Sequence, residues 1–268
     1  MRTAVEPLRF AEPQEVAPLA DFLTRLLRYD RAAAVRLQTA GATLAVFARI
    51  PLGEAGPLVI RTARLAQAHP LDVTVSAGQW LEELSREPQE SGSANEGERL
   101  GKREDLGARE DLGEDEDGLV LPPSITGPAW AGLLPPRSGW EHVADLPTAP
   151  LGAAVAAAVA EFRRAGQPDM GGADGADGAE SAGGAGGDAL AEAIWSRRVH
   201  PSGLTLRALH AAYLTGLLRQ APQLALHQHP AWLRLTAPRG SVIVRRASTP
   251  GAGLGLSFGP SLGGRSPR

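Results

Sequence analysis

Two long segments of this chain contain few large apolar side chains, and they limit which residues can form a core. Residues 87–118 are rich in Gly, Glu and Asp, and residues 166–187 consist mainly of Gly, Ala and Asp. Such segments bury too little apolar surface to offset the conformational entropy lost on folding. The sequence therefore predicts a disordered acidic linker at 87–118, a flexible insert at 166–187 and a disordered tail at 248–268. Roughly 190 residues remain to form one or two domains.

Composition excludes several kinds of site. The chain has no cysteine, which excludes disulfides, thiol nucleophiles and thiolate-bound metals. The longest run of small apolar residues, 151–160, is too short to span a bilayer. The N-terminus lacks an apolar run of signal-peptide length. We therefore expect a cytoplasmic protein with no membrane partner.

Charge is distributed unevenly along the chain. Residues 188–268 carry ten arginines and only Asp188 and Glu192 as acidic residues, whereas the whole chain has a net charge of −3. A basic part of this kind indicates an anionic partner, or an acidic segment of the same chain that lies against it. The sequence leaves both possibilities open.

Residues 1–86 have the pattern of a helix followed by an antiparallel β-meander. Apolar residues recur every three or four positions from Val16 to Leu27, which predicts an amphipathic helix. Ser76 and Gln79 have the spacing of a capping box at the start of a second, short helix. Short connections between the strands require antiparallel pairing. The predicted strands are AVRLQT, TLAVFARI, PLVIRTARL and DVTV.

The remainder of the chain predicts an arm and a helical unit. Residues 119–148 contain two Pro-Pro pairs and should form an extended arm, anchored by Trp130 and Trp140. Residues 149–247 should form a helical unit with a C-terminal hairpin that turns at 238–240. Its predicted helices are 150–164, 188–198 with Asp188 as the N-cap, and 204–219. The predicted fold class is α+β: an N-terminal helix plus antiparallel β-meander, and C-terminal helices closed by a β-hairpin.

A seven-residue stretch occurs twice in nearly the same form, as FLTRLLR at 22–28 and as YLTGLLR at 213–219. Each copy closes a predicted helix, and an apolar-Arg-Leu strand start follows, VRL at 35–37 and LRL at 233–235. Matches of this quality also arise by chance in a chain rich in Leu, Ala, Gly and Arg. An internal duplication of a helix–hairpin unit and a chance match both remain open.

The most distinctive polar stretch is PPRSGWEHV at 135–143. Arg and Trp are frequent anchors of protein interfaces, which makes Arg137, Trp140, Glu141 and His142 a candidate interaction surface. A structural loop that buries Trp140 is the alternative explanation. The sequence contains no nucleophile elbow and no P-loop, so we expect no enzymatic activity and no cofactor. An enzyme with a site around Glu141 and His142 is the third possibility.

The HQH stretch at 227–229 places two imidazoles on one side of an extended segment. Together with His200 or His210 they could hold a metal ion, but no nearby carboxylate or thiol completes the set. Pro230 follows directly, which favours a plain loop without metal.

Helices followed by a hairpin with an arginine at its tip are the element order of a winged helix, a DNA-binding motif. The candidate nucleic-acid contacts are Arg207, Arg219, Arg239, Arg245 and Arg246. The helix at 204–219 carries few of the side chains that read base edges, which argues against this function. We therefore expect a non-catalytic interaction or regulatory protein that binds another protein. The alternative is a winged-helix-like nucleic-acid-binding protein that uses the basic C-terminal part.

The stretches RLLRYDRAAAVRL, PAWAGLLPPRSGWEHVADLP and EAIWSR resemble segments of an uncharacterised conserved protein family of high-GC bacteria. That family has no known activity, so the resemblance implies no chemistry. The Gly-, Asp- and Glu-rich segments look like insertions into its pattern.

Overall fold

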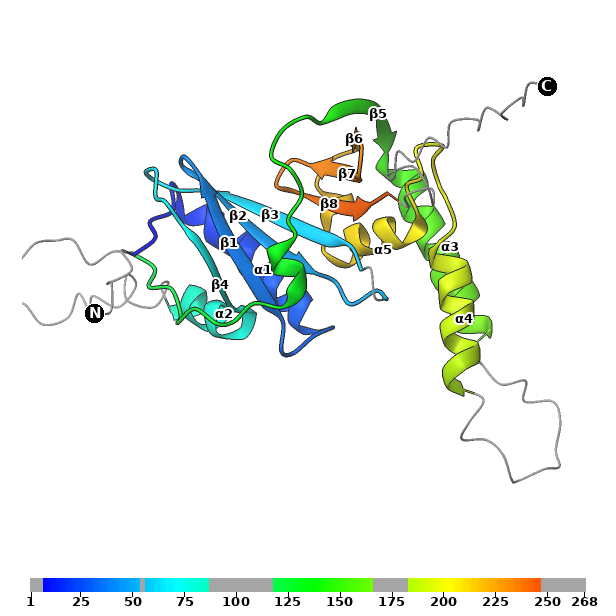
Figure 1. The fold of residues 1–268 in the computed structure, drawn as a ribbon, viewed down its shortest axis with the longest axis horizontal. Helices are drawn as coiled ribbons and strands as arrows, with labels where there is room; N and C mark the ends of the chain where they lie inside the picture. Colours follow the sequence, from blue (N-terminus) through cyan, green and yellow to red (C-terminus); the bar gives the residue numbers. More distant parts are fainter. Residues whose placement is uncertain (1–6, 54–55, 87–117, 166–182, 247–268) are drawn as a thin grey trace, which may run out of the picture.

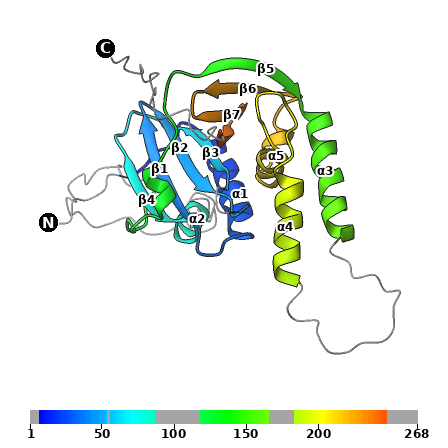
Figure 2. The ribbon, with the colours of Figure 1, turned by 45° about the vertical axis from the view of Figure 1, so that its right-hand side comes forward.

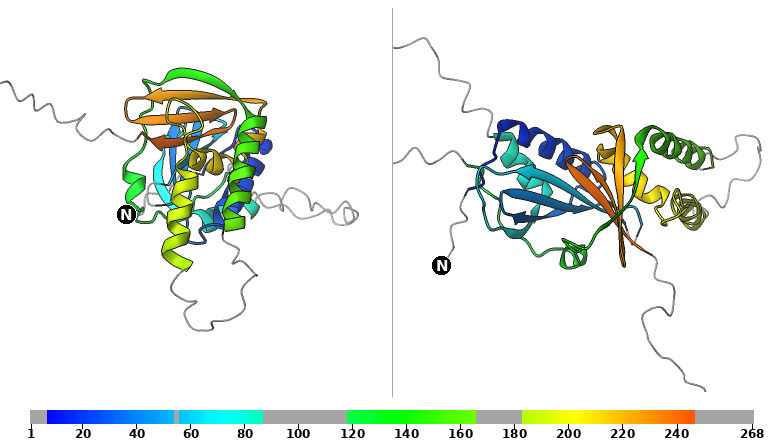
Figure 3. Two further views of the ribbon diagram at one scale, coloured as in Figure 1. Left: turned by 90° about the vertical axis from the view of Figure 1, so that its right-hand side faces the viewer. Right: turned by 90° about the horizontal axis from the view of Figure 1, so that it is seen from above.

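The computed structural model of the chain describes residues 7–53, 56–86, 118–165 and 183–246. Its eight strands form a single antiparallel sheet in the order β4-β1-β2-β3-β8-β7-β6-β5. Helices α1, α2 and α5 cover one side, which we call the helix face (Figures 1 and 3). The later part of the arm, up to Trp140, crosses the other side, which we call the open face. The sheet therefore takes strands from both the predicted meander at 1–86 and the predicted helical unit at 149–247. The predicted domain boundaries stay a prediction.

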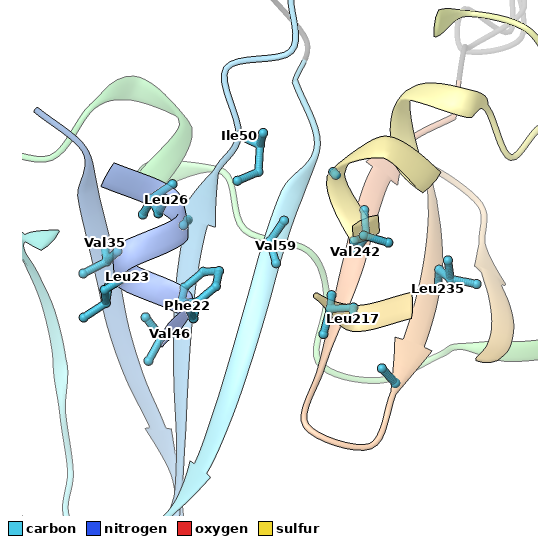
Figure 4. Close-up of a cluster of buried hydrophobic side chains, with 14 of the residues drawn as sticks. Phe22, Leu23, Leu26, Val35, Val46, Ile50, Val59, Leu217, Leu235 and Val242 are labelled. Carbon is cyan, nitrogen blue, oxygen red and sulfur yellow. The ribbon is translucent and has the colours of Figure 1, made fainter. Parts of the chain in front are cut away.

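The N-terminal half of the sheet follows the predicted pattern. Val35 and Leu37 of β1 alternate with half-buried polar residues and lie in the main core, on the helix face. Figure 4 shows Phe22, Leu23 and Leu26 of α1 pointing onto β1 and β2. β4 returns to pair with β1, at the edge of the sheet. The elements of this half are η1 (Pro13–Glu15), α1 (Val16–Leu27), β1 (Ala34–Ala40), β2 (Thr43–Arg49), β3 (Leu58–Arg64), β4 (Asp72–Ser76) and α2 (Ala77–Arg86).

The C-terminal half consists of a second group of four strands and the remaining helices. α5 packs on β8 and α3, and α3 and α4 run side by side beyond the sheet (Figure 2). The elements are η3 (Ala129–Gly132), β5 (Glu141–Pro147), α3 (Thr148–Ala165), α4 (Gly183–Trp195), α5 (Leu206–Leu214), η4 (Leu217–Arg219), β6 (Gln223–His229), β7 (Trp232–Ala237) and β8 (Gly240–Arg245).

The α+β class and the antiparallel pairing are confirmed. The first helix is also confirmed within its predicted bounds. The capping box is half formed, because the backbone N–H of Gln79 donates to Oγ of Ser76 at 3.4 Å. Trp80 and Leu84 of α2 are fully buried.

Two predicted helices differ from the structure. α4 begins at Gly183, so Asp188 lies inside the helix and is not its N-cap. The predicted helix at 204–219 ends at Leu214, because Gly216 adopts a left-handed backbone with φ 76° and a short 3-10 turn follows. Glycine tolerates that conformation without the steric cost that a Cβ would add.

Two strands were missed by the sequence analysis. The arm ends in β5, an edge strand with no buried residue, so it lacks the alternation that marks a half-buried strand. The HQH stretch is the end of β6 and not a loop, and it pairs with both β5 and β7. The predicted hairpin is confirmed as β7–β8.

The predicted linker, insert and tail lie outside the described residues, with two exceptions. Gly118 precedes the bridge between Leu119 and Leu8. Residues 183–187, assigned to the flexible insert, are helical and open α4.

The order of strands is the same from both ends of the sheet. β1, β2 and β3 are consecutive neighbours in one half, and β6, β7 and β8 are consecutive neighbours in the other. A fourth strand pairs with the first of each series, β4 with β1 and β5 with β6. The third strands, β3 and β8, pair at the middle through four positions, which we call the central junction. Figure 4 shows Val59 and Val242 on its two sides.

Candidate functional site

A groove of about 190 Å³ lies on the open face at the central junction. Its floor is apolar and comes from β2, β3 and β8. Phe47, Ile60 and Ile243 of that floor belong to a small cluster of buried side chains separate from the main core. The lining residues are Gln38, Thr39, Ala40, Thr43, Ala45, Phe47, Ile60, Thr62, Pro135, Pro136, Arg137, Arg234 and Ile243.

The wall of the groove is the Pro-Pro-Arg stretch that the sequence analysis singled out. Trp140 fixes this wall, because its Nε1–H donates to the carbonyl oxygen of Pro136 at 2.9 Å. The Trp140 ring lies 5.7 Å from the ring of His229. Gly139, which lies between Pro136 and Trp140 in the sequence, turns the chain with a φ of 79°. Trp140 is half-buried, and its hydrogen bond to Pro136 holds the wall in place.

Arg137 lies at the end of the wall and is exposed. Its Nη2 lies 3.4 Å from Oε1 of Gln38 in β1, a weak hydrogen bond. The charge of Arg137 also acts on Asp72, but the shortest hydrogen bonds to that carboxylate come from Arg36, which donates through Nε at 2.8 Å and through Nη2 at 2.9 Å. These hydrogen bonds lower the pKa of Asp72, and the charge of Arg137 adds a smaller effect. Arg137 thus has no close carboxylate of its own among the described residues.

Arg234 lies on the floor side of the groove and is half-buried. Its Nε donates to Oγ of Ser241 at 3.0 Å, and its Cζ lies 5.8 Å from the ring centre of Trp140. Burial lowers the pKa of this guanidinium, although an arginine stays protonated in proteins. Within the described ranges no carboxylate pairs with it, and its partners are Ser241 and Trp140. The groove therefore combines an apolar floor with two cationic side chains that lack acidic partners.

Glu141 and His142 lie on the edge strand β5, beside the groove and not inside it. Glu141 Oε2 accepts a hydrogen bond from Nε2 of Gln228 at 3.1 Å. His142 lies 3.1 Å from Asp145 and meets the ring of His227 edge-on at 5.5 Å. Burial chiefly lowers the pKa of His227, with smaller effects from the charges of His142 and Arg234. This arrangement gives a polar border on the open face.

The five arginines predicted to contact nucleic acid do not share one surface. Arg245 lies on the open face, with its Cζ 4.8 Å from the ring centre of Trp232. Arg207 and Arg219 belong to α5 and η4 on the helix face, and Arg207 forms an ion pair with Glu192. Arg239 occupies the β7–β8 turn and pairs with Glu15 at 3.6 Å. The backbone N–H of Arg246 donates to Ala231.

The hairpin is not a free wing in this fold. β8 pairs with β3 as well as β7, which places the hairpin at the middle of the sheet. α5 is buried along one side by β8 and α3. A recognition helix needs a face that is free to enter a groove of DNA.

The histidines considered for a metal site lie apart. His227 and His229 alternate along β6 on the open face, whereas His210 stacks on Trp195 at 4.2 Å. His200 accepts a hydrogen bond from the backbone of Ser202. Among the described residues, no three potential ligands gather around one point. In the same part of the chain, no helix is long and apolar enough to cross a bilayer.

Two functional candidates were missed by sequence reasoning, Arg234 and Arg61. Each lies inside a strand of mostly apolar residues, Arg61 in LVIRTAR and Arg234 in WLRLTA. The available signal was alternation, which places Arg61 on the same face as the buried Val59 and Ala63. Arg61 lies on the helix face and is considered below.

Comparison with known proteins gives matches for most of the chain. Residues 3–99 match a family described as "Domain of unknown function (DUF8010)", and residues 135–249 match "Domain of unknown function (DUF8185)". Both halves of the chain match uncharacterised families. This supports the uncharacterised character of the family that the sequence resembles, while its occurrence in high-GC bacteria stays a prediction. Neither description assigns an activity.

A search of curated proteins gave no match. Among solved structures, the chain is similar to one described as "Caulobacter crescentus pol III beta", with 13% sequence identity and a TM-score of 0.40. The alignment covers 86% of this chain and 63% of that chain, which is less than two thirds of its length.

Proposed function

We propose that this protein is a non-catalytic interaction protein that binds an extended segment of another protein in the open-face groove. The segment would place apolar side chains on Phe47, Ile60 and Ile243 and a carboxylate next to Arg234. The observation that carries this proposal is the half-buried guanidinium of Arg234, which has Ser241 and Trp140 as neighbours but no acidic partner in the described residues.

Physical chemistry favours an acidic occupant over a neutral one. A charged group that has lost part of its hydration gains from an ionic hydrogen bond, and the planar guanidinium can bind a carboxylate through two N–H groups. A hydrogen bond to a charged group contributes about 1.5–3 kcal/mol. This corresponds to roughly 10- to 150-fold in Kd. The apolar floor adds affinity in proportion to the area that the occupant covers.

The size of the groove favours a peptide over a folded surface. A volume of about 190 Å³ accommodates a few side chains, and the Pro-Pro wall limits access from one side. An extended segment can place alternate side chains into such a groove while its backbone follows the strands.

Selection from a phage-displayed library of short random peptides tests the proposal with the full chain as bait. We expect the selected peptides to combine apolar residues with Asp or Glu. By fluorescence anisotropy, Arg234→Gln should weaken a selected peptide at least 10-fold. Ala45→Phe, which fills the groove floor, should abolish binding. Arg163→Gln, a change of an exposed arginine on α3, is the matched control and should leave Kd unchanged.

Two results would overturn the proposal. Selected peptides that bind wild type and both groove variants equally well would show that binding occurs elsewhere. Duplex DNA that binds at micromolar concentration or tighter, and loses affinity steeply between about 50 and 200 mM salt, would favour the nucleic-acid alternative when no peptide is selected.

A further inference from the structure

Arg61 is a buried cation without a partner for two of its three guanidinium nitrogens. It lies in the middle of β3, opposite Gly240 of β8, and only 8% of its surface is exposed. Its Nε and Nη1 have no hydrogen-bond partner in the described residues. Burial is the main effect that lowers the pKa of Arg61, and it remains a cation because arginine keeps its proton in proteins.

An unpaired buried charge is costly and therefore rare in folded proteins. Such groups are normally paired or saturated with hydrogen bonds. The carboxylates near Arg61 do not fill this role, because each binds another arginine. Asp21 accepts a hydrogen bond from Nε of Arg25 at 3.0 Å. Glu15 lies 3.1 Å from Nε of Arg64 and 3.6 Å from Nη1 of Arg239.

A second buried donor lies at the same corner of the central junction. The amide of Gln220 accepts a hydrogen bond from the backbone N–H of Arg239 at 3.0 Å, but its Nε2 is buried and has no partner. Arg239 directly precedes Gly240, the residue that pairs with Arg61. Strand β3 and the residue that follows η4 thus each contribute an unsatisfied buried N–H group at this corner.

Further arginines make the surroundings positive. A Cβ placed on Gly216 would lie 3.6 Å from Nη2 of Arg219 and 3.8 Å from Nε of Arg25, so both guanidinium groups adjoin this glycine. After burial, the charge of Asp21 has the next largest effect on the pKa of Arg61 and raises it, whereas the charges of Arg239 and Arg25 disfavour the protonated form. Repulsion of this kind is relieved when an anion binds between the cations.

We propose that the helix face binds a small oxyanion of the phosphate type at the central junction, between α1 and η4. Arg61 is the buried ligand, Gln220 supplies a neutral N–H group, and Arg25 and Arg219 close the site from the surface. A phosphate has enough acceptor oxygens to satisfy several of these donors, and it matches the planar fork of a guanidinium. The slight exposure of Arg61 favours a small ion, or a single phosphate group, over a larger ligand.

Arg61→Met is the decisive variant, measured in the full chain by thermal unfolding in phosphate-free buffer and with millimolar inorganic phosphate. Chloride of equal ionic strength serves as the reference. A ligand at ten times its Kd raises the Tm of a protein of this size by about 3–6 °C. We expect this rise in wild type and in Arg163→Gln, and its loss in Arg61→Met. Without phosphate, Arg61→Met should match or exceed the Tm of wild type, because an apolar side chain replaces an unpaired buried charge.

Isothermal titration with inorganic phosphate and with phenyl phosphate provides the second measurement. Arg219→Gln, which leaves the core untouched, should weaken phosphate binding at least fivefold. Tighter binding of inorganic phosphate indicates a free ion as the ligand, and tighter binding of phenyl phosphate indicates a phosphate group on a larger molecule. The proposal is overturned if wild type and Arg61→Met respond equally to phosphate, which would be general salt exclusion. It is also overturned if Arg61→Met unfolds well below wild type without phosphate.

Discussion

Gly240 opens β8 at the central junction, in contact with the backbone of β3. A Cβ built on this residue lies 2.2 Å from the carbonyl oxygen of Ile60 and 3.3 Å from Cδ2 of Leu217. Carbon–oxygen contacts are normally no closer than about 3.3 Å. Gly240→Ala therefore has to move β3 and β8 apart by about 1 Å, because the Ile60 carbonyl belongs to the backbone and cannot rotate away, whereas Leu217 needs only a small shift.

The cost of this change follows from the short junction. Only four residue pairs join β3 to β8, so a displacement at Gly240 affects a large share of the pairing between the two halves. Overpacking and weakened hydrogen bonds together should lower the free energy of unfolding by about 2–4 kcal/mol. For a chain of this size the Tm should fall by roughly 5–15 °C.

Urea and thermal unfolding of Gly240→Ala, followed by circular dichroism, check this value. Gly152→Ala is the matched control, because Gly152 lies inside α3 and a Cβ there meets no atom within 4 Å. That substitution should raise stability by about 0.5–1 kcal/mol through helix propensity. If Gly240→Ala stays within about 0.5 kcal/mol of wild type, the reasoning about the close approach of β3 and β8 is refuted.

The remaining predictions concern titratable groups. The pKa of Asp72 is lowered in the folded protein, chiefly by its hydrogen bonds from Arg36, so its contribution is present above the unfolded pKa near 4 and is lost as pH falls. Asp72→Asn should cost at most about 1 kcal/mol at pH 7 because the pair is half exposed, and chemical denaturation should show the difference shrinking as pH falls below about 4. Burial lowers the pKa of His210, so below about pH 6.5 the unfolded state binds the proton more readily and stability falls. His210→Phe, which retains the stacking on Trp195, should flatten the decline of Tm between about pH 7.5 and 5.5, and an unchanged slope would contradict this assignment.

Local patterns in the sequence predicted most of the N-terminal half. The spacing of apolar residues in α1 and the alternation in β1 are properties of neighbouring residues, and burial selects both directly. β5 and the first residues of α4 lacked such signals. β5 is an exposed edge strand, and α4 begins with glycines that have low intrinsic helix propensity.

The candidate site could be predicted only in part, for the same reason. Arg137 and Trp140 stood out because a local cluster of polar and aromatic residues marks an interface, and both contribute to the wall of the groove. Arg234 and Arg61 act through neighbours that are distant in sequence. Their surroundings depend on the pairing of β3 with β8, and no local pattern specifies which strands become neighbours.

The symmetry of the sheet explains why both proposed sites lie at the central junction. The two copies of the seven-residue stretch occupy equivalent places, one before β1 and the other before β6, the first strands of the two consecutive series. Thr24 and Thr215, at matching positions, both donate to the carbonyl oxygen four residues earlier, at 2.8 Å and 2.7 Å. These features favour an internal duplication. VRL and LRL, in contrast, lie on β1 and β7, which are not equivalent strands.

Matching positions of two copies meet where an approximate two-fold axis passes between them. Arg25 of the first copy corresponds to Gly216 of the second, and the Arg25 side chain lies against that glycine. A second arginine at position 216 would compete with Arg25 for the same space and would repel it. Glycine at 216, where the first copy has arginine, leaves room for the Arg25 side chain. On the adjoining strand, Ile60 faces the groove and Arg61 faces the oxyanion site. Each site takes residues from both halves, so neither half alone could form it.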